Sequence, residues 1–292
     1  LRRCVLYGTI IIDLETGRFV GLLNGREKEP LLEWLNEHPL VNMVSRDRAS
    51  AFSAAVEEAS PFITQIADRF HLVKNMSDCL VKILQGMQLD YQRVIRKMRL
   101  DDYLEQHPNS PPGDDLDLYR DRVYYEFFVN RKTLTQVHQL LQEQGMSFSL
   151  RDFCDKYRHL RAWRNKVKIV DNPQVPAAIL PLYPPLALAN LVEQHIRGKS
   201  ISECAERIIN KLTQCQWFSE LYNAVKGFFL FIRERNLSRL KEWIEQHVKS
   251  SLSELRTLAR GLARDVEAVN NALKYEFSNG IVEGYVNKLK AL

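Results

Sequence analysis

Apolar positions in the first part of the chain alternate between strand and helix spacings. The run CVLYGTIIIDL stops at DLETG and resumes as RFVGLL, a pattern that predicts a β-hairpin. Residues 27–38 carry leucines at helical spacing and end at Pro39. The run VNMVS, the Ala-rich stretch ASAFSAAVEEA and the run FITQIA follow in that order. Residues 1–75 are therefore predicted to have the element order ββαβαβ.

Beyond this part the apolar spacing is almost entirely helical. Two Pro-rich breaks, at 107–115 and 171–186, predict edges between helical parts. Residues 131–170 between them predict either a helix-turn-helix or a plain helical hairpin. Aromatic and leucine stripes at 217–229 and 252–273 predict two amphipathic helices that pack in a core.

The chain is therefore expected to have three parts. Residues 1–75 form a sheet part, residues 76–270 form a helical part, and residues 271–292 form a closing helix. This arrangement places the strands at one end of the sequence and a long helical stretch after them.

The composition indicates a globular protein without a membrane segment. The chain has 292 residues, and a 45% apolar share is enough to fill a core. No apolar run approaches the ~18 residues that cross a bilayer, and the first residues turn polar too soon for a signal peptide. The five cysteines include no C-x-x-C pair, which favours reduced structural thiols. We expect a cytoplasmic protein.

Positive charge is concentrated in one window. The net charge is +5, and residues 151–170 contain seven Lys or Arg against Asp152 and Asp155. Such clustering is typical of proteins that contact phosphates, but solvated basic helices are also common. Both interpretations stay open from charge alone.

Two acids follow the two short apolar runs of the sheet part. Asp47 comes after VNMVS and Asp68 comes after FITQIA, so both are expected at the carboxyl edge of the sheet. Clustered carboxylates suit a hard cation such as Mg²⁺. The pattern around Asp47 is also that of an acid that caps the next helix, and pattern alone favours this structural role. His71 lies one helical step beyond Asp68 and either shares a hydrogen bond with it or is structural.

The last stretch, SNGIVEGYVNKLKAL, predicts a capped helix with a polar face. Glu283, Asn287 and Lys290 fall on that face and offer a metal ligand, an amide and an ammonium for phosphate. An acid in the first turn is also favoured by the helix dipole alone.

Four blocks of the chain together resemble the catalytic core of a known family. The blocks are YGTIIIDLETGR, SRDRA, ADRFHLVKN and SNGIVEGYVNKLK. Their order and spacing are similar to those of bacterial DDE transposases of the insertion-sequence type, in the ISL-three branch related to the Mutator-like group. The resemblance is strong over residues 1–80 and 236–292 and loose over the helical middle.

The resemblance implies an α/β fold with a ribonuclease-H-like mixed sheet and a large all-helical insertion. It implies that Asp47 is the second acid of the catalytic triad and Glu283 the last, both as metal ligands. Asp68 and His71 fall on the family's D-x-x-H signature and would support catalysis nearby. The implied cofactor is Mg²⁺, with Mn²⁺ as an alternative.

The implied reaction is DNA strand cleavage and strand transfer during transposition of an insertion sequence. The implied partners are transposon inverted-repeat ends and target DNA, bound by a homo-oligomer associated with the nucleoid. The candidate phosphate contacts are Lys288, Lys290, Arg158, Arg161, Arg164, Lys166 and Lys168.

One departure from the family concerns the first acid. It belongs to a DDFA-like strand immediately before L-R-R, and this sequence starts at Leu1, so we expect the chain to be clipped at both ends. Asp13 lies at the hairpin turn and is better explained as a turn residue. A catalytically incomplete fragment that only binds DNA is therefore the alternative function. A metal phosphohydrolase is a remoter rival, opposed by the basic helices and by the lack of a second histidine ligand.

Overall fold

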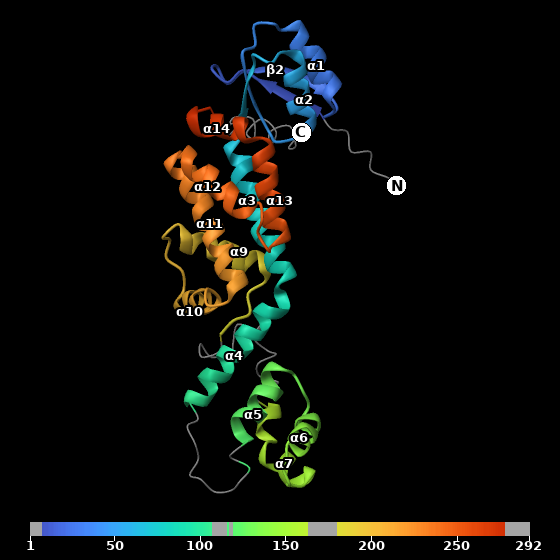
Figure 1. The fold of residues 1–292 in the computed structure, drawn as a ribbon, viewed down its shortest axis with the longest axis vertical. Coiled ribbons are helices and arrows are strands. Elements are labelled where there is room, and N and C mark those ends of the chain that lie inside the picture. The colour runs from blue at the N-terminus through green and yellow to red at the C-terminus, as the bar shows by residue number, and fades with distance from the viewer. Residues whose placement is uncertain (1–7, 107–115, 117–118, 163–179, 278–292) are drawn as a thin grey trace. The chain divides into compact units, whose positions relative to one another are not determined.

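The structure is a computed structural model that describes residues 8–106, 116, 119–162 and 180–277 (Figure 1). Its residues divide into two compact units. Residues 1–82 and 220–292 form what we call the sheet unit, and residues 83–219 form the helical unit. The three predicted parts, with boundaries at residues 75 and 270, stay a prediction. No helix in the described ranges is long and apolar enough to cross a membrane.

The sheet unit begins with the predicted element order. The elements are β1 (Gly8–Ile12), β2 (Phe19–Asn24), α1 (Lys28–Glu37), β3 (Met43–Arg46), α2 (Ser50–Ala59) and β4 (Thr64–Ala67). The β1–β2 hairpin is antiparallel, as expected, and the β3–β4 pair is parallel. The hairpin turn is closed by Asp13, whose Oδ1 accepts hydrogen bonds from the Glu15 and Thr16 backbone N–H groups. Asp13 therefore acts as a turn residue.

The strand pairing supports the expected fold only in part, and the single ribonuclease-H-like mixed sheet stays a prediction. In the described part of the chain, β1–β2 and β3–β4 form two separate two-stranded sheets. Strands β1 and β3 do not pair with each other, and both line the same cavity. The protein is mostly helical, with two small sheets.

The sheets rest on a small apolar core. Leu31 and Leu35 of α1 pack with Ala55 and Val56 of α2, and partly buried residues of β1 and β3 cover this cluster. Burial of these side chains fixes both helices against the strands, since each buried aliphatic side chain contributes roughly 1.5–3 kcal/mol.

The other helices that lie wholly or mostly in the sheet unit are α3 (Arg69–Gly86), α11 (Gln216–Glu234), α12 (Leu237–His247), α13 (Ser253–Arg264) and α14 (Val266–Lys274). The aromatic stripe is core, as predicted, because Phe228 and Phe231 are fully buried against Trp243. Helix α14 lies along β4, where the Asn271 side-chain amide donates to the Gln65 carbonyl over 2.9 Å.

The predicted helix over 252–273 is instead two helices. The break is at Asp265, which lies between α13 and α14 with φ −115° and ψ 26°. The apolar spacing continues through the break, so the pattern of side chains did not reveal it. The cause is tertiary, because the Asp265 carboxylate turns toward arginines at the end of β3.

The helical unit contains α4 (Gln88–Gln106), α5 (Arg120–Tyr124), the π-helix η2 (Tyr125–Val129), α6 (Leu134–Glu143), α7 (Leu150–Lys156), α9 (Pro185–Ile196) and α10 (Glu203–Leu212). Helix α6 starts with a capping box formed by Thr133 and Gln136. It is followed by a turn at Gly145, with φ +98°, and by α7. The arrangement of α6 and α7 is compatible with a helix-turn-helix and with a plain helical hairpin. Residues 163–170 of the predicted segment lie outside the described ranges.

Candidate active site

The carboxyl ends of β3 and β4 lie side by side. Arg46 pairs with Ala67 in the parallel register, and the Asp68 backbone N–H donates to the Arg46 carbonyl over 2.9 Å. Asp47 and Asp68 are the next residue on each strand. They therefore leave the same edge, which is where sequence reasoning expected them.

Asp47 is partly engaged by its own loop. Its Oδ1 accepts a hydrogen bond from the Ala49 backbone N–H over 2.9 Å, and Ala49 is the cap residue of α2. The Asp47 side chain does not cap the helix itself. One carboxylate oxygen thus orients the side chain, and a second oxygen remains for another ligand.

Asp68 is buried and incompletely bonded. Its side chain is 1% exposed, and its Oδ1 accepts from the Phe70 backbone N–H over 3.1 Å. Its Oδ2 is buried without a hydrogen-bond partner and lies 3.7 Å from His71 Nε2, too far for a normal hydrogen bond. A buried carboxylate oxygen without a donor is unfavourable by ~1–3 kcal/mol, so a cation in contact with it would stabilise it.

The guanidinium group of Arg46 connects the end of β3 to several neighbouring segments. Its guanidinium contacts Asp265 through two N–H···O bonds, Nη2 to Oδ1 at 2.8 Å and Nη1 to Oδ2 at 3.4 Å. Its remaining donors reach the Gln65 side chain, the Ser53 hydroxyl and the Asp47 carbonyl. All five guanidinium donors are used, so Arg46 holds β3, β4, α2 and the α13–α14 junction together.

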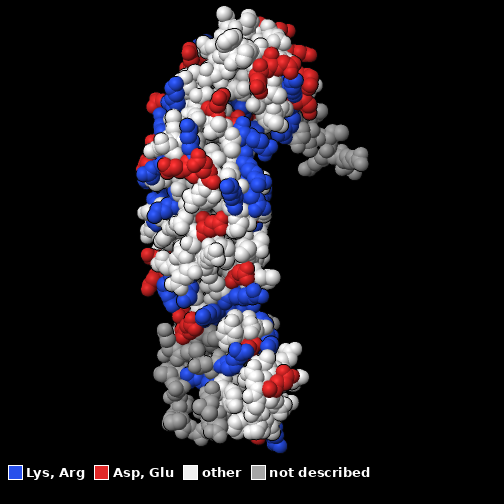
Figure 2. Space-filling model, viewed as in Figure 1, with Lys and Arg blue, Asp and Glu red and all other residues white. Residues whose placement is uncertain are grey.

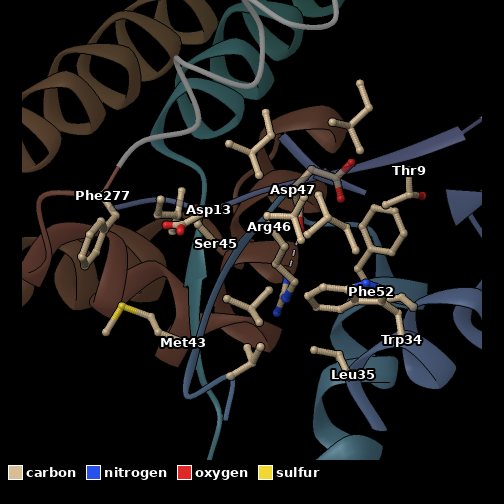
Figure 3. Close-up of a pocket in the computed structure, with 18 of the residues that line it drawn as sticks. Thr9, Asp13, Trp34, Leu35, Met43, Ser45, Arg46, Asp47, Phe52 and Phe277 are labelled. Atoms are coloured by element: carbon tan, nitrogen blue, oxygen red, sulfur yellow. Dashed lines mark hydrogen bonds between the residues drawn. The ribbon is translucent and has the colours of Figure 1, made fainter. Parts of the chain in front are cut away.

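A cavity of about 690 Å³ opens beside this edge (Figure 3). All residues of β1 and β3 line it, and Trp34, Leu35 and Phe52 contribute to its apolar wall. Asp13, Asp47 and His71 line the same cavity. Asp68 is not among the residues that line the cavity, whereas His71 is.

The described chain also ends at this cavity. Phe277 lines it, and Arg69 at the start of α3 donates to the carbonyls of Tyr275, Glu276 and Phe277 at 3.3, 2.8 and 3.5 Å. Arg235 adds an ion pair to Glu276 at 3.4 Å. The guanidinium of Arg69 therefore holds the backbone that leaves α14 next to the Asp47 edge.

A family model described as a transposase, of the DDE type and the ISL-three branch, matches residues 2–172 and 197–292. The chain belongs to this transposase family. No curated protein and no solved structure matched the chain. The family resemblance seen in the sequence blocks is thus confirmed.

Several predicted site residues of this transposase cannot be located. Glu283, Lys288 and Lys290, and likewise Arg164, Lys166 and Lys168, lie outside the described residues. Arg158 and Arg161 are described and exposed, in the helical unit. The structure therefore brings together Asp47, Asp68 and His71, and it leaves the pairing of Asp47 with Glu283 a prediction.

The side chains at the carboxyl ends of β3 and β4 provide only some of the ligands that a hard cation such as Mg²⁺ needs. Asp47 and Asp68 offer carboxylate oxygens, the ligands that Mg²⁺ prefers, and one buried oxygen of Asp68 lacks a partner. Within the described ranges, no group of three or more His, Cys, Asp or Glu side chains is placed to hold a metal ion. A complete site needs a further acid.

Sequence reasoning missed three residues of this site. Arg46, Asp265 and Arg69 organise the edge, yet each was overlooked because its partner is more than two hundred positions away. The block SRDRA contains Arg46 next to Asp47, and an arginine at the end of a buried strand was the available clue.

Proposed function

We propose that this transposase cleaves DNA strands and joins them to target DNA during transposition of an insertion sequence, using Mg²⁺ or Mn²⁺. In this proposal Asp47 and Glu283 hold the metal ions, and His71 and Asp68 orient groups next to them. The metal ions, when bound, activate a water or a terminal hydroxyl for in-line attack at phosphorus and stabilise the leaving oxygen. The proposed partners are transposon ends and target DNA, bound by a homo-oligomer in the nucleoid.

One observation carries the proposal. Asp47 and His71 line a single cavity, and Phe277, six positions before Glu283 in the sequence, lines it too. Arg69 donates to the carbonyls of residues 275–277, so the last described residues before Glu283 in the sequence lie beside the same edge. Asp47 keeps its carboxylate oriented through the Ala49 N–H, which suits a ligand that must be in position before the metal arrives.

We further propose that the two small sheets are parts of one ribonuclease-H-like sheet. The cavity lies along the edges of β1 and β3 that have no partner strand among the described residues. Neighbouring strands lie ~4.8 Å apart, so one strand inserted between these edges would join both pairs. If that strand runs parallel to β3, its carboxyl end meets the Asp47 edge, which is where the first acid of the family would be useful.

A strand-transfer assay tests these roles. Mg²⁺-dependent joining of a labelled transposon end is measured for the protein and for its variants. Asp47→Asn and Glu283→Gln, which keep side-chain shape, should lose more activity than the roughly 10–100-fold expected for a residue that only supports a ligand, such as His71→Gln. Asp13→Asn is the matched control, because this acid lines the same cavity but serves the hairpin turn. Wild-type joining by both Asp47→Asn and Glu283→Gln would show that the roles are wrong.

The second candidate is a DNA-binding module without turnover. The exposed Arg158 and Arg161 of the helical unit support it, since exposed basic side chains suit contacts with phosphates. On this view the 292-residue chain binds DNA with steep salt dependence and shows no cleavage at any Mg²⁺ concentration. Robust cleavage by the chain alone would exclude it.

A further inference from the structure

Helix α13 carries a row of arginines. In the sequence SELRTLARGLAR, Arg256, Arg260 and Arg264 are four positions apart, and residues at this spacing share one face of a helix. The opposite face is apolar and buried through Leu255, Ala259 and Leu262. The rise of a helix separates neighbouring arginines of the row by ~6 Å, which is similar to the spacing of successive phosphates along a DNA strand.

Two members of the row have free charges. Arg260 and Arg264 are exposed, and neither makes an ion pair or hydrogen bond within the described ranges. Arg256 differs, because its guanidinium donates to the Ser250 carbonyl over 2.8 Å. Like charges at this helical spacing repel by roughly 0.2–0.5 kcal/mol, so the row is not explained by the stability of the helix.

The row continues to the Asp47 edge. Arg48 follows Asp47 in the chain, and its Nη2 lies against Gly261 of α13, 3.0 Å from where a β-carbon would stand. Burial lowers the pKa of Arg48 from its ordinary value, and the charges of Arg46 and Arg264 lower it further, although Asp265 opposes this.

Three guanidinium groups gather around one carboxylate at this place. Arg46 and Arg48 share the single carboxylate of Asp265, at 2.8 and 3.5 Å, and Arg264 adds a third positive charge nearby. Figure 2 shows Lys and Arg gathered along the side of the sheet unit where α13 runs in Figure 1. An anion in contact with Arg48 and Arg264 would partly offset these positive charges.

We propose that Arg260 and Arg264, continued by Arg48, bind the phosphodiester backbone of a DNA strand and lead it to the Asp47 edge. Guanidinium groups suit this role, because they stay charged and donate two parallel hydrogen bonds to phosphate. The inference rests on the proposed function, since it assumes that DNA is the substrate. It assigns a binding surface on α13, which is not among the phosphate contacts predicted from the sequence.

The test is a binding titration that needs no catalysis. A fluorescein-labelled duplex of mixed sequence is titrated with the 292-residue chain in the absence of divalent metal, over about 50 to 200 mM salt. The variant pair Arg260→Gln/Arg264→Gln is compared with Lys226→Gln/Lys241→Gln. The two lysines are exposed, lie on α11 and α12, and have no ion pair among the described residues, so both variants lose two positive charges from one unit. Thermal melting checks that both variants fold like the parent chain.

Loss of two phosphate contacts should lower the slope of log affinity against log salt by about 1.8 for duplex DNA, and removal of the lysines should leave it unchanged. Equal losses in both variants, or no loss in the arginine variant, would overturn this inference while DNA binding itself persists. Absence of binding by the parent chain would instead refute the proposed function.

Discussion

The ion pair between Arg46 and Asp265 should carry much of the stability of the sheet unit. Arg46 is 5% exposed, and its guanidinium is held by two contacts to the Asp265 carboxylate across 219 positions of sequence. Asp265 is the only carboxylate that pairs with Arg46 or Arg48 in the described part of the chain. Replacing it with asparagine leaves two closely spaced guanidinium groups without a counter-charge.

The magnitude follows from burial. Removing one partner of a buried ion pair costs about 3–5 kcal/mol, and we expect the lower end because the Asp265 side chain retains 19% exposure. Asp265→Asn should therefore lower the free energy of unfolding by about 3 kcal/mol, which shifts a urea midpoint by about 1.5 M at a slope near 2 kcal/mol/M. Asparagine keeps the size of the side chain, so the loss reports the charge.

Urea unfolding followed by circular dichroism measures this loss. Glu267→Gln is the matched control, because Glu267 also starts α14 but is exposed and makes no ion pair among the described residues. We expect it to change stability by less than about 0.5 kcal/mol. A loss below about 1 kcal/mol in Asp265→Asn would refute the reasoning, since it would mean that water or another group replaces the carboxylate.

Further consequences concern Arg69 and two buried titratable groups. Arg69→Gln should speed chymotrypsin cleavage after Tyr275 or Phe277, because it removes three hydrogen bonds to backbone carbonyls of residues 275–277. Arg239→Gln is the control and should leave the cleavage rate unchanged; equal rates in the two variants would contradict the role of Arg69. Burial raises the pKa of Cys79 to about 12, so a thiol reagent at pH 8 should modify it only on unfolding, and rapid labelling seen by mass spectrometry would disprove this. Burial also lowers the pKa of His247 below its ordinary value of 6.5, and the charge of Glu220 opposes this. As the pH falls below 6.5, the unfolded chain binds a proton at this histidine before the folded chain does, so the free energy of unfolding should decrease. In thermal melts over this pH range, His247→Leu should make the decrease smaller.

The order of elements and the family could be predicted from the sequence. Alternation and helical spacing depend on which side of each element is buried, and this information is local. The same reasoning placed Asp47 and Asp68 at a common edge, because acids directly after two buried strands of a parallel pair emerge together. The four sequence blocks together indicated the transposase family, which the family match confirms.

Contacts between distant segments were decided only by the tertiary structure. Spacing could not show that β1 and β3 stay apart, that the stripe over 252–273 breaks at Asp265, or that Arg69 holds residues 275–277. Each of these depends on a partner that the chain brings near from far away, and the periodicity of one element carries no information about that partner. Local pattern therefore determined the parts and their exposed faces, while packing determined which charged groups meet at the edge of the sheet.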